Sequence, residues 1–151
     1  MTTSLSPDLA RQCAAAHELG HAFAGREAGL TPDRLVVGGF FHGGYCQFER
    51  AWVPCHLLWQ AGVMLAAGQA GDTIYRREHQ LGMPMSFGTE DDERMFAGLF
   101  VDQQDGSCFL TPSDGTWEQA VEEAETLLLG VWDELLPLVI PLAVHGKLDG
   151  I

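Results

Sequence analysis

Two histidines and a glutamate near the start of this 151-residue chain have types and spacing that could do chemistry. His17 and His21 stand four residues apart, and Glu18 directly follows the first of them, in the sequence HELGH. In an α-helix, residues four apart lie one turn above each other, so both imidazoles can face a single metal ion. Glu18 would lie at the margin of that site, where its carboxylate can take a proton from a water molecule. The motif therefore predicts two metal ligands and a general base.

Zinc is the metal that this pattern favours. Neutral imidazole is a good zinc ligand, and a catalytic zinc site uses three protein ligands plus one water, whose pKa falls towards about 7. Alanines surround the motif, which predicts that its helix is largely buried. An unpartnered buried polar group costs about 1–3 kcal/mol, so the three polar side chains are expected to share a partner. The alternative is an accidental pair of histidines on a surface helix, with Glu18 in a solvated ion pair.

A third ligand must come from elsewhere in the chain. Gly88 and Thr89 are followed by four consecutive acids, Glu90–Glu93, whose dense negative charge would attract a dication. The alternative is purely structural: Thr89 as an N-cap with Asp92 three residues later resembles a capping box, and the helix dipole favours acids in any first turn. Spacing alone does not choose among the four acids.

One mainly helical α+β domain spanning residues 1–151 is expected to position these groups. Ser6-Pro7-Asp8 predicts the start of the first helix, and Gly29 predicts its end near Ala28. Three glycines in the second helix are expected to mark close helix packing: Gly62, Gly68 and Gly71. The predicted helices cover 7–28, 54–77, 89–101 and 116–136, a short last helix follows Pro137 or Pro141 and ends near Gly146, and loops cover 81–88 and 102–115.

A β-hairpin is predicted between the first two helices. Residues 34–41 and 45–53 are rich in β-branched and aromatic side chains, and Gly43-Gly44 between them can supply the positive φ angles of a tight turn. Towards the C-terminus, the apolar runs 127–129 and 135–140 are expected to pack in the core. A homo-oligomer built on an apolar patch from these runs is the alternative.

Composition excludes several classes of partner. Eight Lys and Arg against 21 Asp and Glu give a net charge of −13, and Lys147 is the single lysine, so we expect no nucleic-acid binding. No stretch reaches the ~20 uninterrupted apolar residues of a membrane span, so no membrane association is expected. The N-terminus lacks the basic start and apolar run of a secretion signal, which predicts a cytoplasmic protein.

The four cysteines are far apart and form no CxxC pair: Cys13, Cys46, Cys55 and Cys108. In a reducing compartment, this pattern is typical of buried small apolar side chains and not of a disulfide framework.

Three segments together carry a resemblance to a known family: HELGHAFAGREAGLTPDRLVVGG, LAAGQAGDTIY and FGTEDDERMFAG. In this order and at similar separations, they resemble the zinc peptidase domain of the FtsH family of ATP-dependent proteases. The resemblance implies a zincin-like fold with an HExxH helix, a small β-hairpin or sheet and a C-terminal helical bundle. It also places Asp92 where the family has the aspartate that is its third zinc ligand. Gly71-Asp72 and Glu90-Asp91 depart from the family's pattern.

The resemblance and the HExxH motif together predict a zinc-dependent metallopeptidase in which His17, His21 and Asp92 bind Zn²⁺ and Glu18 is the general base. A peptide or protein substrate would lie extended along an edge of the hairpin sheet, as the resemblance implies and as strand addition permits. The sequence contains no GxxxxGK[ST] phosphate-binding loop, so the activity is expected to be independent of ATP. The alternative is a non-catalytic, zinc-containing regulatory or protein-binding domain on the same scaffold.

Overall fold

The computed structural model describes residues 7–38, 44–50, 52–81 and 89–151. This part of the chain is mainly helical and carries one small antiparallel sheet, which confirms the predicted α+β class. In chain order, the elements are α1 (Pro7–Glu27), β1 (Pro32–Val36), β2 (Tyr45–Phe48), the 3₁₀ turn η1 (Cys55–Leu57), α2 (Leu58–Glu78), α3 (Thr89–Gly98), the 3₁₀ turn η2 (Pro112–Asp114), α4 (Trp117–Gly130), α5 (Trp132–His145) and β3 (Lys147–Asp149).

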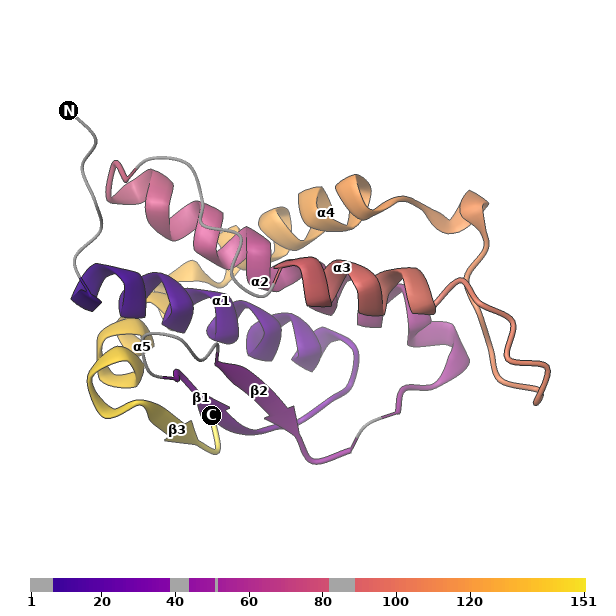
Figure 1. Ribbon diagram of the computed structural model, residues 1–151, viewed down its shortest axis with the longest axis horizontal. Helices are drawn as coiled ribbons and strands as arrows, with labels where there is room; N and C mark the ends of the chain where they lie inside the picture. The colour runs from indigo at the N-terminus through magenta and orange to yellow at the C-terminus, as the bar shows by residue number, and fades with distance from the viewer. Residues whose placement is uncertain (1–6, 39–43, 51, 82–88) are drawn as a thin grey trace.

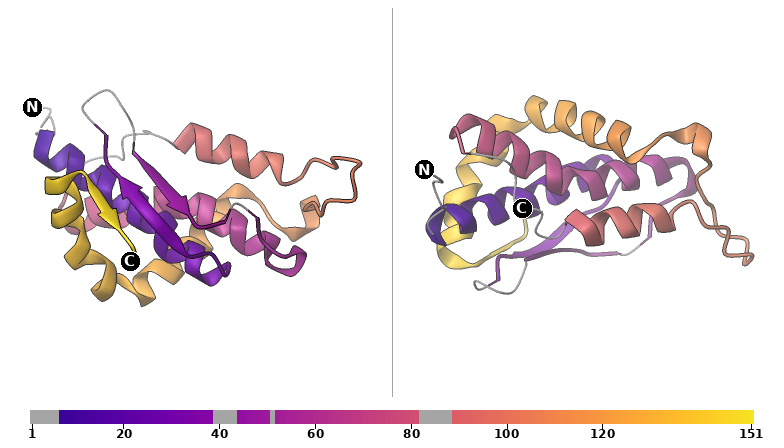
Figure 2. Two further views of the ribbon diagram at one scale, coloured as in Figure 1. Left: turned by 90° about the horizontal axis from the view of Figure 1, so that it is seen from below. Right: turned by 45° about the horizontal axis from the view of Figure 1, so that its top comes forward.

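Helix α1 is the centre of the architecture. It lies between the sheet on one side and α2 on the other, while α4 covers the far side of α2 and α5 packs against α1 near the chain's N-terminal end (Figure 1, Figure 2). Glycines let α1 and α2 approach closely, because a side chain at Gly20 would collide with the carbonyl of Ala67 and one at Gly71 with the carbonyl of Ala16. The prediction that Gly71 marks close helix packing is therefore confirmed.

The predicted end of the first helix is confirmed to within one residue. Gly29 adopts a left-handed conformation, with φ of +75°, which residues other than glycine rarely adopt. Its N–H donates to the carbonyl of Arg26 and that of Leu30 to the carbonyl of Gly25, both at 3.0 Å, so the last turn of α1 is closed. The predicted cap at Ser6 lies outside the described residues.

The sheet has the strand order β2-β1-β3, and both pairings are antiparallel. The predicted hairpin is confirmed as a pairing of β1 with β2, in which Leu35 lies opposite Cys46. The predicted strand bounds, 34–41 and 45–53, are wrong: β1 begins earlier and ends at Val36, and β2 ends at Phe48. The predicted turn at Gly43 lies outside the described residues. Strand β3 was not predicted, and it places Leu148 opposite Leu35 on the other side of β1. On the described residues, β2 is an edge strand, and the ring of Phe48 at its end packs against Gly25 of α1.

The chain turns earlier than predicted in its C-terminal part. The expectation of one helix over 116–136 that stops at a proline is wrong, because α4 ends at Gly130 and α5 begins at Trp132, at an angle of 91°. Both Pro137 and Pro141 lie inside α5. An interior proline costs about 3 kcal/mol, but each large apolar side chain that α5 buries contributes about 1.5–3 kcal/mol. Those side chains are Trp132, Leu135, Val139 and Leu142.

The ends of the third and last helices differ less from the predicted ends. The third helix ends at Gly98, three residues before the predicted Val101, and its single fully buried side chain is Phe96. Helix α5 ends at His145, next to the predicted Gly146, which adopts the left-handed conformation. The apolar C-terminal runs divide between core and surface: Leu128, Leu135 and Val139 are buried, whereas Leu129, Leu136 and Ile140 are exposed. Self-association through the exposed set stays a prediction.

A disulfide joins Cys55 to Cys108, and this contradicts the prediction of four reduced cysteines. The bond connects the 3₁₀ turn before α2 with the loop that follows α3, across 53 residues of sequence and a Cα–Cα distance of 5.7 Å. The prediction holds for Cys13, which is a buried free cysteine, while Cys46 is free and half-buried. Disulfides persist mainly in oxidising surroundings, so the cytoplasmic location stays a prediction.

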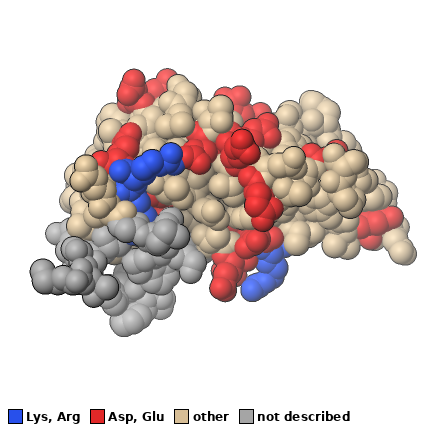
Figure 3. Space-filling view, turned by 90° about the horizontal axis from the view of Figure 1, so that it is seen from above, with Lys and Arg blue, Asp and Glu red and all other residues tan. Residues whose placement is uncertain are grey.

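Acidic side chains outnumber basic ones on the face shown in Figure 3, as the net charge of −13 leads one to expect. Among the described residues, no single helix is both long enough and apolar enough to cross a bilayer. The stretches Pro112–Gly130 and Trp132–His145 meet that test by length and composition only when counted as one bent pair.

Candidate metal centre

The two histidines of the HELGH segment point to the same side of α1. The Nε2 atoms of His17 and His21 lie 3.1 Å apart, and the rings meet edge to face with centroids 4.7 Å apart. Both side chains are buried, with 7% and 6% of their surface exposed. This follows from the sequence, because a four-residue spacing aligns side chains along one helix face and the surrounding alanines bury that face.

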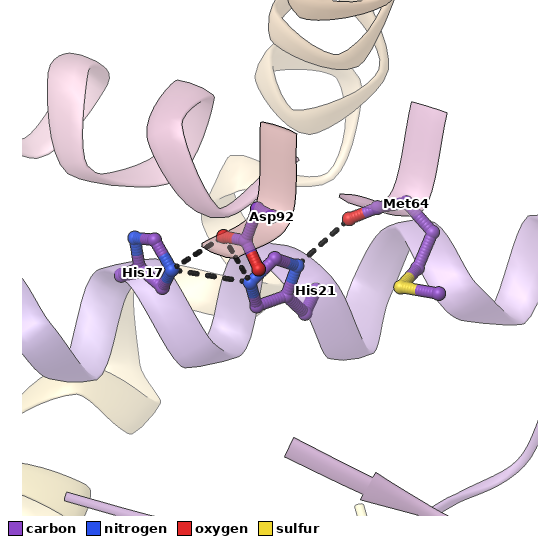
Figure 4. A network of polar contacts seen from close by, with 4 residues as sticks. All are labelled: His17, His21, Met64 and Asp92. Atoms are coloured by element: carbon purple, nitrogen blue, oxygen red, sulfur yellow. Dashed lines mark hydrogen bonds and ion pairs between the residues drawn. The ribbon is translucent and has the colours of Figure 1, made fainter. Parts of the chain in front are cut away.

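Asp92 completes the group from α3. Its Oδ2 atom lies 3.1 Å from the Nε2 of His17 and 3.1 Å from the Nε2 of His21 (Figure 4). The three atoms therefore form a triangle with equal sides of 3.1 Å. Within the described parts of the chain, these three residues are the group of His, Cys, Asp and Glu side chains that could hold a metal ion.

The dimensions of this triangle suit zinc. Ligand distances of about 2.0–2.2 Å in tetrahedral geometry put neighbouring ligand atoms about 3.3 Å apart. The observed 3.1 Å sides are close to that separation, so the triangle is compatible with a metal ion of this size. Three protein ligands leave one tetrahedral position for water or substrate, which is the arrangement of catalytic and not of structural zinc sites.

The hydrogen bonding of His21 also calls for a cation. Its Nδ1 lies 2.8 Å from the carbonyl oxygen of Met64 on α2, and a carbonyl can only accept, so Nδ1 carries the proton (Figure 4). A neutral ring then presents the lone pair of Nε2 to the carboxylate of Asp92, and two acceptors face each other. Either a second proton or a metal ion between them removes this conflict. The Met64 carbonyl thus fixes the tautomer that a zinc ligand requires.

The pKa values of His21 and Asp92 are both shifted in the direction that favours the charged form of each group. Burial by itself lowers the pKa of His21, but the hydrogen bond and charge of Asp92, the charge of Glu18 and the Met64 carbonyl outweigh it and raise the pKa to about 9. Burial raises the pKa of Asp92, yet hydrogen bonds from His17 and His21 and their charges hold it far below its usual range. The carboxylate is therefore ionised and available as a ligand.

Glu18 lies beside this triangle and is itself buried, with 6% of its surface exposed. Burial raises its pKa, although the charges of His21 and His17 act in the opposite direction. A carboxylate with a raised pKa is a stronger base near neutral pH. Glu18 also lies next to the start of β2, since a Cβ added at Gly44 would come within 3.1 Å of its Cγ. The predicted base and the edge strand are thus neighbours.

The structure separates Asp92 from the other acids of the Glu90–Glu93 run. Glu90, Asp91 and Glu93 are exposed on α3, and Asp91 pairs with Arg94 at 3.2 Å. Only Asp92 is directed at the two imidazoles. The capping-box alternative therefore does not describe the contacts of Asp92, whose carboxylate lies against the imidazoles.

A buried ion pair close to the histidines was not predicted. Asp72 and Arg76 of α2 are 6% and 4% exposed, and the Nε of Arg76 donates to Oδ1 of Asp72 at 2.8 Å. Burial raises the pKa of Asp72, and the charges of Arg76 and His17 oppose this. Their four-residue spacing on a helix was the available signal, but it does not distinguish a buried pair from a surface pair.

The remaining histidines that the structure describes take no part in the triangle. His56 and His145 are exposed, and the Nδ1 of His79 donates to the carbonyl of Tyr75 at 2.8 Å. His42 lies outside the described residues.

No protein-family model and no curated protein matches this chain. The likeness to the FtsH peptidase domain therefore rests on the residues quoted above and stays a prediction.

Proposed function

We propose that this protein is a zinc-dependent metallopeptidase. The observation that carries the proposal is the equal-sided triangle formed by Nε2 of His17, Nε2 of His21 and Oδ2 of Asp92, with the buried Glu18 beside it. The donor set of two imidazoles and one carboxylate suits zinc and leaves a coordination position open. Without a metal ion, a second proton on His21 takes the place between its Nε2 and the carboxylate of Asp92, and zinc would replace that proton.

Each residue has a role that follows from its position. Bound zinc would supply a Lewis acid that polarises the scissile carbonyl and lowers the pKa of a water. Glu18 accepts a proton from the attacking water and donates it to the leaving amide nitrogen, because its burial raises its affinity for a proton. The Met64 carbonyl holds the His21 ring in the tautomer and orientation that a ligand needs.

The edge of β2 is the proposed substrate-binding surface. Extended peptides can add a strand to an exposed sheet edge through main-chain hydrogen bonds. β2 pairs with β1 along one edge, and its first residues lie near Glu18. A substrate strand on the outer edge would therefore pass close to the base. Main-chain pairing accepts many sequences, so unfolded peptides and exposed tails are the expected substrates.

Metal analysis followed by a cleavage assay tests this function. The protein as isolated with zinc present should bind one zinc per chain and cleave an unfolded peptide library in a chelator-sensitive way. His21→Ala should lose both properties. Zinc bound at one per chain without cleavage of any library peptide would contradict the peptidase and would favour the non-catalytic zinc-binding domain. Absence of zinc binding would contradict both.

A further inference from the structure

One face of α2 lies over the metal centre. Met64, Gly68 and Asp72 follow one another at four-residue spacing, so they lie on one side of the helix. Met64 contributes the carbonyl that binds His21, and the charge of Asp72 acts on His17. Gly68 lies between them, opposite the two imidazoles.

A side chain at Gly68 would collide with the metal ligands. A Cβ built on this residue would lie 2.5 Å from Nε2 of His17, 2.5 Å from Nε2 of His21 and 2.6 Å from Cε1 of His17. An ordinary contact begins at about 3.4 Å, so both rings would have to move by nearly an ångström. The atoms in conflict are the two nitrogens that would bind the metal.

The other glycines of α2 have different neighbours. Gly71 faces the backbone carbonyl of Ala16, and Gly62 faces the ring of Phe96, with a built Cβ 3.0 Å from its Cε2. Those two positions concern the packing of α2 against α1 and α3. Close helix packing was predicted for all three glycines, but Gly68 contacts ligand atoms and no backbone of another helix among its nearest neighbours.

We propose that Gly68 is a positioning residue of the metal centre, required because any side chain there displaces the Nε2 atoms of His17 and His21. A glycine at the middle of α2 weakens the helix by about 1 kcal/mol relative to alanine, so the position works against helix stability. Loss of an indirect partner of a metal ligand lowers affinity about 10–100-fold. Gly68→Ala shifts two ligands at once, and at least a 100-fold loss of zinc affinity is expected.

The inference rests on the proposed metal site, and the test separates the two. Zinc affinity is measured by competition with a chromophoric chelator, geometry by the visible spectrum of bound Co²⁺, and fold by thermal unfolding of the metal-free protein. The variants are Gly68→Ala, Gly71→Ala and Gly98→Ala. Gly98 is the last residue of α3, and a Cβ added there would meet no other atom within 4 Å, so it is the neutral control.

The two buried glycines should give opposite results. Gly68→Ala should lose zinc affinity and the tetrahedral Co²⁺ spectrum while the metal-free protein remains folded. Gly71→Ala should lower the unfolding temperature and, where the protein is folded, keep zinc affinity within about fivefold. Wild-type protein that binds no zinc would refute the metal site itself. Wild-type binding together with Gly68→Ala binding within fivefold of it would refute only the role of Gly68.

A second measurement covers the case in which Gly68→Ala unfolds. If the methyl group collides with the imidazoles, removing one ring should relieve the collision. The loss of unfolding free energy caused by Gly68→Ala should then be smaller in the His17→Ala background than in wild type. An equal loss in both backgrounds would show that the methyl group collides with something else, and it would overturn the proposal without reference to zinc.

Discussion

The Oδ2 atom of Asp92 lies 3.1 Å from the Nε2 of His17, although 75 residues separate them in sequence. This contact joins α3 to the helix that carries the HELGH segment, and the same oxygen is equally close to His21. Helix α3 also packs through Phe96, its one buried side chain, against Trp59 and Trp117. The position of α3 therefore decides whether Asp92 reaches the two histidines.

Removal of the Asp92 carboxylate should abolish tight zinc binding. Asp92→Ala leaves two imidazoles, and we expect zinc affinity to fall at least 100-fold because one of three protein ligands is lost. Isothermal titration with zinc measures the loss. Asp91→Ala is the matched control, since Asp91 is the exposed neighbour that pairs with Arg94. Equal effects of the two variants would show that general negative charge, and not ligation, attracts the ion.

Substitution of the base should separate binding from catalysis. Glu18→Gln keeps the size of the side chain but cannot accept a proton, so peptide cleavage should fall by about 10²–10⁴-fold. Zinc content should stay at about one per chain, because Glu18 is not part of the ligand triangle. Glu27→Gln, an exposed change at the end of the same helix, should leave the rate unchanged. Retention of activity in Glu18→Gln would exclude it as the base.

Metal-free and zinc-loaded protein should respond to pH in opposite ways. The pKa of His21 is raised to about 9 in the folded protein, above the ordinary value of about 6.5. Protonated His21 therefore stabilises the metal-free fold fully below pH ~6.5, and this stabilisation is lost as pH rises through about 9. Zinc must displace that proton, so zinc affinity should increase with pH over the same range.

Denaturant unfolding at several pH values, with and without zinc, measures both effects. The decrease in metal-free stability between pH 6.5 and 9 should be absent in His21→Ala. A metal-free wild-type protein whose stability is constant or rises over this range would show that His21 is not held protonated by Asp92 and Glu18.

Much of the local structure could be predicted because its signals are local. The HELGH spacing, the glycine after α1 and the β-branched runs act over a few residues, and the corresponding helix and hairpin are present. Asp92 is different: the acids around it have the same chemistry, and only the packing of α3 decides which of them reaches the histidines. From the sequence, the choice needed a family resemblance.

The incorrect predictions concern contacts between distant segments. Cys55 and Cys108 form no recognisable spacing motif, and their proximity depends on where the loop after α3 crosses the start of α2. The turn between α4 and α5 was assigned to a proline, but burial of Trp132 and the bond from its Nε1 to Glu78 at 2.8 Å place it earlier. Strand β3 has three residues, Lys147–Asp149, which is too short for an alternating pattern to be recognised, so its pairing with β1 could not be predicted.

Breaking the unexpected disulfide should destabilise the fold. For a loop of 53 residues, the chain-entropy relation gives about 4 kcal/mol. Cys55→Ser, Cys108→Ser and the double variant should each lose a similar amount of unfolding free energy, because either single change already breaks the bond. Urea denaturation measures all three. Additive losses in the double variant would mean that the two cysteines act independently and are not bonded.

The most direct test of the account is a crystal structure of the zinc-loaded protein with anomalous diffraction collected at the zinc absorption edge. We predict one strong anomalous peak within about 2.0–2.2 Å of Nε2 of His17, Nε2 of His21 and Oδ2 of Asp92. Zinc bound elsewhere, or bound by the two histidines with Asp92 out of reach, would contradict the proposed centre.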